Sequence, residues 1–132
     1  MTLVDTCIWL DVFSNDATWA DWSQAQLDIA FDSGGIVINP IIYAELSVGF
    51  DDYRMLDKAL SSLEVRIRNL MRPSLFLAGK AFRQYRKRGG TRASVLPDFF
   101  IGAQAAIQGW PVLTRDVTRI GGYFPTVTLL SP

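Results

Sequence analysis

The sequence predicts an α/β domain with a short central parallel sheet flanked by helices. Three short apolar segments typical of buried strands, residues 2–5, 36–38 and 111–114, are separated by longer stretches with helical spacing. Residues 127–130 predict one more strand near the carboxyl end. Strands that alternate with helices indicate parallel pairing, because a parallel connection must cross back over the sheet. We expect a single domain over residues 1–132.

The stretches between the strands carry apolar residues near helical spacing, with start and stop signals at their ends. Gly34 and Gly35 stop the first long helix, and Asn39 and Pro40 provide the N-cap and the first turn of the next. Helices are expected over residues 16–35, 41–50, 52–70 with a break near Val65, 74–90 and 98–109.

Composition excludes several classes of protein. Histidine is absent, which removes Ser-His-Asp and Cys-His mechanisms and histidine-ligated metal sites. The single cysteine, Cys7, forms no internal disulfide and has no histidine to activate it as a nucleophile. No apolar run is long enough to span a membrane, and the start of the chain does not resemble a signal peptide. We therefore expect a cytoplasmic protein without membrane contact.

Charges are segregated although the formal net charge is zero. Residues 1–52 contain nine acidic residues and no Lys or Arg. Residues 65–97 contain several Lys and Arg residues and no Asp or Glu. The densest basic segment contains Arg83, Arg86, Lys87, Arg88 and Arg92. One interpretation is a patch that contacts RNA phosphates. The other is a solvated helix end, where cations interact favourably with the helix dipole.

Four acidic residues stand at the edges of the predicted elements: Asp5, Glu45, Asp98 and Asp116. Taken singly, the three aspartates could each be helix caps. Taken together, they could converge on one cleft at the carboxyl ends of the strands, where open parallel sheets bind ligands. Two carboxylates ~5 Å apart repel by about 3 kcal/mol at an effective dielectric of ~20. Mg²⁺ or Mn²⁺, which prefer oxygen ligands, would relieve that repulsion.

The sequence resembles the PIN-domain family, specifically the VapC-type toxin ribonucleases of bacterial toxin–antitoxin pairs. The resemblance spans nearly the whole chain in the order typical of the family, through "LVDTCIWLDVF", "NPIIYAELSVGF", "LFLAGKAFRQYRKRGG", "LPDFFIGAQAAIQGWPVLTRD" and "YFPTVTLLSP". It implies a metal-dependent endoribonuclease that acts as the toxin of such a pair. It also implies an RNA substrate, a cognate antitoxin and a homodimer.

The resemblance further implies roles for particular residues. Asp5, Glu45, Asp98 and Asp116 match the four catalytic acids, with Asp5 and Asp98 as ligands of Mg²⁺ or Mn²⁺. Thr6 and Thr114 match hydroxyls that support these acids by hydrogen bonds. One departure is Arg119, which lies near the place where some relatives carry another acidic or amide residue, and which disfavours a second metal site.

Two other functions fit parts of the sequence. An aspartyl-phosphate protein would use Asp5 as a nucleophile, but the chain lacks the second aspartate of a D-x-D motif and a lysine near "LTRD". A catalytically silent PIN-fold module that binds RNA or a protein partner is the main alternative. A metal-binding titration distinguishes it from the nuclease.

Overall fold

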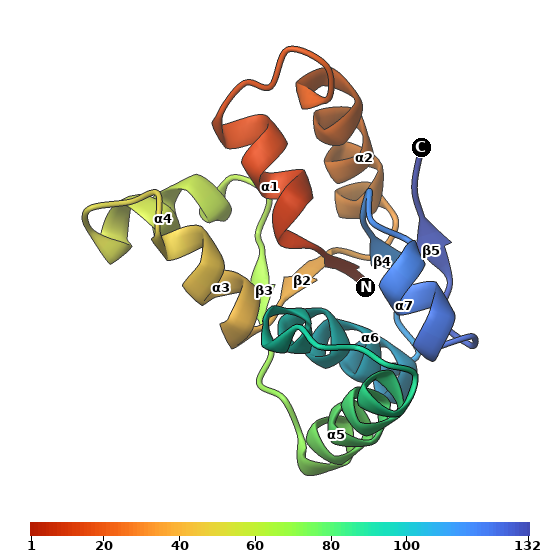
Figure 1. The fold of residues 1–132 in the computed structure, drawn as a ribbon. Helices are drawn as coiled ribbons and strands as arrows, with labels where there is room; N and C mark the ends of the chain where they lie inside the picture. Colours follow the sequence, from red (N-terminus) through yellow and green to blue (C-terminus); the bar gives the residue numbers. More distant parts are fainter.

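A five-stranded parallel sheet forms the centre of the protein (Figure 1). The computed structural model describes residues 1–132. The strands lie in the order β3-β2-β1-β4-β5, and every neighbouring pair is parallel. The α/β class and the parallel sheet predicted from the sequence are therefore confirmed. The strands are β1 (Thr2–Val4), β2 (Ile36–Ile38), β3 (Arg66–Ile67), β4 (Val112–Leu113) and β5 (Leu129–Leu130).

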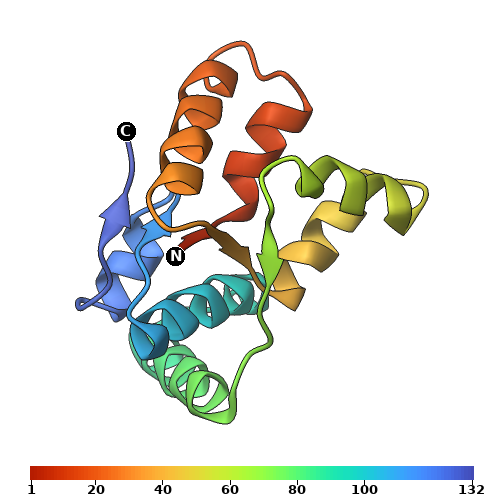
Figure 2. The same cartoon turned by 180° about the vertical axis from the view of Figure 1, so that it is seen from behind.

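Helices cover both faces of this sheet (Figures 1 and 2). α1 and α2 pack together on one face, and α5 and α6 pack together on the other. α3 and α4 extend away on the β3 side, whereas α7 packs on α6. None of the helices is long and apolar enough to span a membrane. The helices are α1 (Thr6–Phe13), α2 (Ala20–Asp32), α3 (Pro40–Ser47), α4 (Tyr53–Ser61), α5 (Arg72–Lys87), α6 (Leu96–Gln108) and α7 (Thr118–Tyr123).

The register of the central strands brings two polar residues together. Leu3 pairs with Val37 on one side and with Val112 on the other, and all three are fully buried. Burying each such side chain contributes about 1.5–3 kcal/mol, so a slip of the register would be costly. Parallel strands end at the same edge of a sheet. Asp5 and Thr114, which follow β1 and β4, therefore become neighbours.

The predicted start of α3 and the predicted end of the α2 segment are confirmed. The Asn39 side chain accepts a hydrogen bond from the Ile42 backbone N–H at 2.9 Å, and Pro40 occupies the first turn. Gly34 and Gly35 have φ angles of 121° and 99°, a conformation that favours glycine. These signals were readable because they depend only on local backbone chemistry.

All the predicted helices differ from the structure by a few residues at their ends, and two of them differ most. The helix expected over 16–35 begins late, because the Asp16 carboxylate accepts a hydrogen bond from the Thr18 backbone N–H and closes a turn before α2. In the segment expected over 52–70 the break predicted near Val65 is present, because Glu64, at φ 50°, turns the chain after α4, but the residues beyond the break form β3 and not a helix. β3 consists of two exposed residues, too few to show an alternating pattern.

Candidate active site

Asp5 joins the end of β1 to the start of α1, and both of its carboxylate oxygens are hydrogen-bonded. Its Oδ1 accepts from the Thr6 backbone N–H at 2.7 Å, which makes Asp5 the N-cap of α1. Its Oδ2 accepts from the Thr114 hydroxyl at 2.8 Å, beyond the end of β4. The cap and the candidate site residue are thus the same carboxylate, and its orientation is fixed from two sides.

Burial makes the ionised form of Asp5 unfavourable. The residue is only 8% exposed, and desolvation by burial is the main cause that raises the pKa of Asp5 above its ordinary value. Hydrogen bonds from Thr114 and Thr6 oppose this rise in pKa, whereas the negative charges of Asp98 and Glu45 add to it. A cation beside these acids would offset both the desolvation and the repulsion.

Glu45 reaches the site from α3. Its Oε1 accepts a hydrogen bond from the Thr6 hydroxyl at 2.8 Å. Thr6 therefore contacts two acids: its backbone N–H donates to Asp5 and its hydroxyl donates to Glu45. Glu45 is otherwise exposed, which leaves its second oxygen, Oε2, without a hydrogen-bond partner in the protein.

Asp98 lies in the first turn of α6 and forms an ion pair with α7. Its Oδ2 accepts from Arg119 Nη1 at 2.8 Å, and about 30% of each side chain is exposed, 31% and 28%. The N-cap position of α6 belongs to Val95, so the interpretation of Asp98 as a helix cap is wrong. The Asp98 side chain is available for a cation, and in this structure that cation is a guanidinium.

Asp116 is joined to Asp5 through a threonine. The Asp116 backbone N–H donates to Thr114 Oγ1 at 3.0 Å, and the same hydroxyl donates to Asp5. Val117 is the N-cap of α7 and no side chain caps that helix, so the cap interpretation of Asp116 is also wrong. The exposed Asp116 side chain lines a hollow of about 230 Å³, which we call the Asp116 hollow, together with Tyr85, Thr118, Arg119 and Tyr123.

The donor chemistry fits a hard divalent cation. Asp5, Glu45 and Asp98 offer only oxygen atoms, and the negative charges of Glu45 and Asp98 help to raise the pKa of Asp5. No group of three acidic or thiol side chains lies close enough together in this structure to coordinate one metal ion. Mg²⁺ commonly takes only one or two carboxylates and keeps several waters, so the pair Asp5 and Asp98 suits it better than a full protein cage would.

A partly buried ion pair, which no pattern in the sequence predicts, holds the loop after β4. The Arg115 guanidinium donates twice to Asp11, from Nε to Oδ2 and from Nη2 to Oδ1, both at 2.9 Å. The Ser23 hydroxyl donates to the same carboxylate at 2.7 Å, and the guanidinium lies 5.1 Å from the Trp19 ring centre. These contacts raise the pKa of Arg115, mainly through its hydrogen bonds to Asp11. Because Arg115 lies between Thr114 and Asp116, the pair fixes the segment that carries both.

Cys7 is placed beside the acids but is poorly suited to act as a nucleophile. Its thiol lies 3.7 Å from Asp5 Oδ2. Burial, followed by the negative charge of Asp5, raises the pKa of the Cys7 thiol. A protonated thiol is a weak nucleophile. The expectation that Cys7 carries no chemistry of its own is consistent with this environment.

The basic segment lies at the end of α5 and in the turn that follows. Arg83, Arg86 and Lys87 belong to the last turns of α5, and Arg88 is its C-cap. The Arg88 guanidinium lies over the Tyr123 ring, 4.8 Å from its centre, which joins the segment to α7. Arg92 precedes a short 3₁₀ turn that leads into α6.

Comparison with known proteins assigns the chain to a family. The sequence profile of the PIN domain matches residues 2–118, most of the chain. The protein belongs to the PIN domain family. Among curated protein sequences, none matches this PIN domain.

Solved structures with the same fold come from toxin–antitoxin systems. VapBC2 from Rickettsia felis, bound to a DNA fragment from its promoter, has a TM-score of 0.75 at 18% identity over 98% of this chain and 97% of that one. FitAcB from Neisseria gonorrhoeae has a TM-score of 0.72 at 21% identity, covering 100% and 98%. A toxin–antitoxin complex from Klebsiella pneumoniae has a TM-score of 0.71 at 21% identity, covering 100% and 98%. At these identities the similarity shows the fold of the PIN domain.

Proposed function

We propose that this PIN domain is the toxin of a toxin–antitoxin pair and that it acts as an Mg²⁺- or Mn²⁺-dependent endoribonuclease. The observation that carries the proposal is Asp5, a buried carboxylate held by two threonines while the charges of Glu45 and Asp98 act on it. Such an arrangement favours a bound cation over three bare acids. The similar structures of toxin–antitoxin complexes support an antitoxin as the partner. A cytoplasmic location and assembly as a homodimer, which the resemblance to VapC-type toxins implies, are part of the proposal.

Each residue of the site has a separate role in the proposed hydrolysis. Asp5 and Asp98 would hold the cation, which when bound would neutralise charge on the phosphate and lower the pKa of a nearby water. Thr6 and Thr114 keep Asp5 oriented. Glu45 has Oε2 free to accept a proton from the attacking water.

The reaction adds one water across one phosphodiester bond. The water oxygen bonds to phosphorus, the P–O bond to the leaving ribose breaks, and the leaving oxygen is protonated. One product strand ends in a phosphate and the other in a hydroxyl. Asp116, exposed at the rim of the site, is suited to orient the water or the leaving group. Arg83, Arg86, Lys87, Arg88 and Arg92 are proposed to contact RNA phosphates.

RNA-end mapping after brief expression tests this function in cells. We expect new internal RNA ends at defined positions with the wild-type protein and none with Asp98→Asn. Co-expression of the antitoxin should suppress the new ends. If wild type and Asp98→Asn yield the same RNA ends, Asp98 takes no part in cleavage and the proposed site is wrong.

A catalytically silent PIN domain is the second candidate, and the Arg119–Asp98 ion pair favours it. If Arg119 only competes with the cation for Asp98, Arg119→Gln should increase the affinity for Mn²⁺ about two- to tenfold, the effect expected from a partly exposed ion pair. Isothermal titration with Mn²⁺ measures this, and Arg119→Lys, which keeps the charge, is the control. A protein that binds no Mn²⁺ even as Arg119→Gln would be the silent module.

A further inference from the structure

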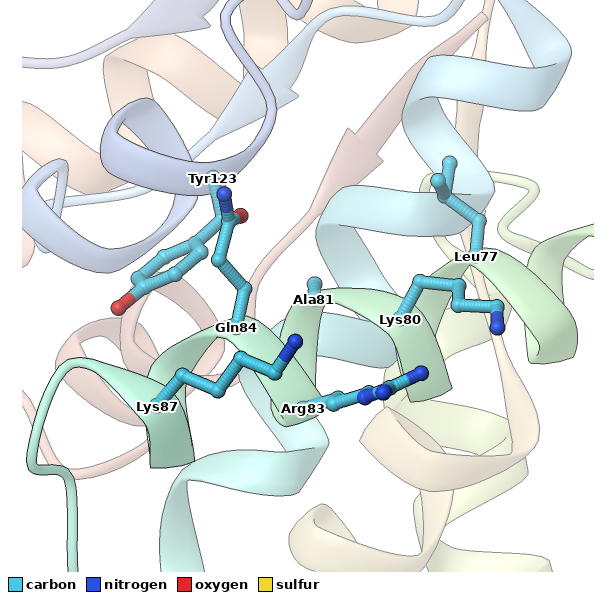
Figure 3. A pocket seen from close by; sticks show the side chains of 7 residues that line it. All are labelled: Leu77, Lys80, Ala81, Arg83, Gln84, Lys87 and Tyr123. Atoms are coloured by element: carbon cyan, nitrogen blue, oxygen red, sulfur yellow. The ribbon is translucent and has the colours of Figure 1, made fainter.

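A groove beside the candidate site is lined by cations and contains no acid (Figure 3). It lies between α5 and α7 and encloses about 420 Å³. Lys80, Arg83 and Lys87 come from α5 with the amide of Gln84, Leu77 and Ala81 of α5 form its apolar part, and Tyr123 comes from α7. We call it the α5 groove. Lys80 lies outside the basic segment singled out in the sequence.

The three cations form one stripe along the helix. Positions 80, 83 and 87 are three and four residues apart, so their side chains leave α5 on the same face. At 1.5 Å per residue they span about 10 Å. A stacked strand carries one phosphate per roughly 3.4 Å, so the stripe faces about three phosphates.

None of these cations is neutralised within the protein. The ion pairs of the chain join Arg54 to Asp52, Arg115 to Asp11 and Arg119 to Asp98. Lys80, Arg83 and Lys87 are exposed and take part in none of them. Like charges three or four residues apart destabilise a helix by a few tenths of a kcal/mol per pair. An anionic ligand would remove that repulsion.

Other cations of the α5 segment do not line the groove, whereas Lys80 lines it although its Nζ also lies over an aromatic ring, that of Phe76, 4.8 Å from its centre. The Arg86 guanidinium lies over the Phe82 ring, 5.4 Å from its centre, on another face of α5. Arg88 lies over Tyr123 at the edge of the α5 groove. Of the cations near the end of α5, only Lys80, Arg83 and Lys87 line the groove.

Tyr123 connects the α5 groove to the acidic site. It is the residue that lines both the α5 groove and the Asp116 hollow. The Asp116 hollow in turn contains Arg119, which binds Asp98. A ligand with regularly spaced negative charges could thus continue from the acids, past Tyr123, into the groove. A nucleic acid strand has that spacing.

We propose that the α5 groove binds the backbone phosphates of the RNA strand that flanks the cleavage site, with Tyr123 at the passage between the two. The proposal rests on the proposed ribonuclease function for the identity of the strand. It adds Lys80 to the RNA contacts and gives the strand a path across α5 and α7.

Fluorescence anisotropy with a short, labelled, unstructured RNA tests the groove. The parent is the Asp5→Asn protein, so that the RNA stays intact. The groove triple adds Lys80→Gln, Arg83→Gln and Lys87→Gln, since glutamine keeps the helix propensity. The control triple adds Arg54→Gln, Lys58→Gln and Arg66→Gln, on α4 and β3, and removes the same charge.

The groove triple should reduce the log–log salt slope of RNA binding by about 2 and weaken binding about 100-fold at 0.1 M salt. The control triple should change neither quantity. Equal behaviour of the two triples, or a parent that binds no RNA, overturns the proposal. The proposal is also overturned if the groove triple loses affinity for poly-glutamate but keeps its affinity for RNA. That result would show that the groove binds an acidic protein segment.

Cleavage by proteins with Asp5 intact separates this inference from the proposed function. The groove triple should raise KM for a long RNA and leave KM unchanged for an oligonucleotide too short to reach the groove. An equal rise in KM for both substrates would overturn the path across α5. If the wild type cuts neither RNA, the proposed function fails, while the anisotropy result still decides whether the groove binds RNA.

Discussion

Asp5→Asn should abolish RNA cleavage, by about 10³-fold or more, and at the same time raise the melting temperature at pH 7. The loss of activity follows from removing a proposed ligand of the cation. The gain in stability follows because burial and the charges of Asp98 and Glu45 disfavour an ionised Asp5. Each 1 kcal/mol relieved raises Tm by roughly 3–6 °C for a chain of this size. Thermal melts and a cleavage assay on the same preparations measure both effects.

The pH dependence of this gain has a definite sign. The pKa of Asp5 is raised in the folded protein, so the cost of its charge is present above that folded pKa and vanishes below the ordinary value of 3.8. The advantage of Asp5→Asn over the wild type should therefore shrink as the pH falls toward 3.8. Added Mg²⁺ should stabilise the wild type and not the variant. A variant less stable than the wild type at pH 7 without metal would contradict this account of Asp5.

Local chemistry made much of the fold predictable. The strand before Asp5, the Asn39–Pro40 start of α3 and the Gly34–Gly35 stop each depend on a few adjacent residues. β3 was not predictable from the sequence, because its two residues are exposed and show no hydrophobic pattern. They form an edge strand because they pair with β2. The late start of α2 depends on the side chain of Asp16, which competes with the helix for backbone hydrogen bonds.

The candidate site was predictable where residues follow strands and unpredictable where distant elements meet. Asp5 and Thr114 come together because β1 and β4 are parallel neighbours, which the fold class anticipates. Nothing in the sequence pairs Asp11 with Arg115 or Asp98 with Arg119, since these contacts depend on how the helices pack. The resemblance to PIN domains predicted which acidic residues form the site, but it did not predict the arginines that pair with Asp11 and Asp98.

Removal of divalent metal should have an effect as large as the loss of Asp5. Asp5, Asp98 and Glu45 offer oxygen atoms only, a donor set that suits Mg²⁺ and Mn²⁺. Without a cation these acids repel one another and would repel the RNA phosphate. We therefore expect no detectable cleavage in excess EDTA and recovery of the full rate when Mg²⁺ or Mn²⁺ is returned in excess over the chelator.

The initial rate of cleavage of an end-labelled RNA by the purified protein tests the central claim most directly. It should be measured in Mg²⁺, in excess EDTA and after Mg²⁺ is restored, with Asp5→Asn purified in parallel to reveal any contaminating nuclease. We predict rapid cleavage by the wild type in Mg²⁺, none in EDTA, recovery on restoration, and none by Asp5→Asn under any condition. An undiminished rate for the wild type in EDTA, or equal rates for wild type and Asp5→Asn, would show that this acidic site does not cut RNA.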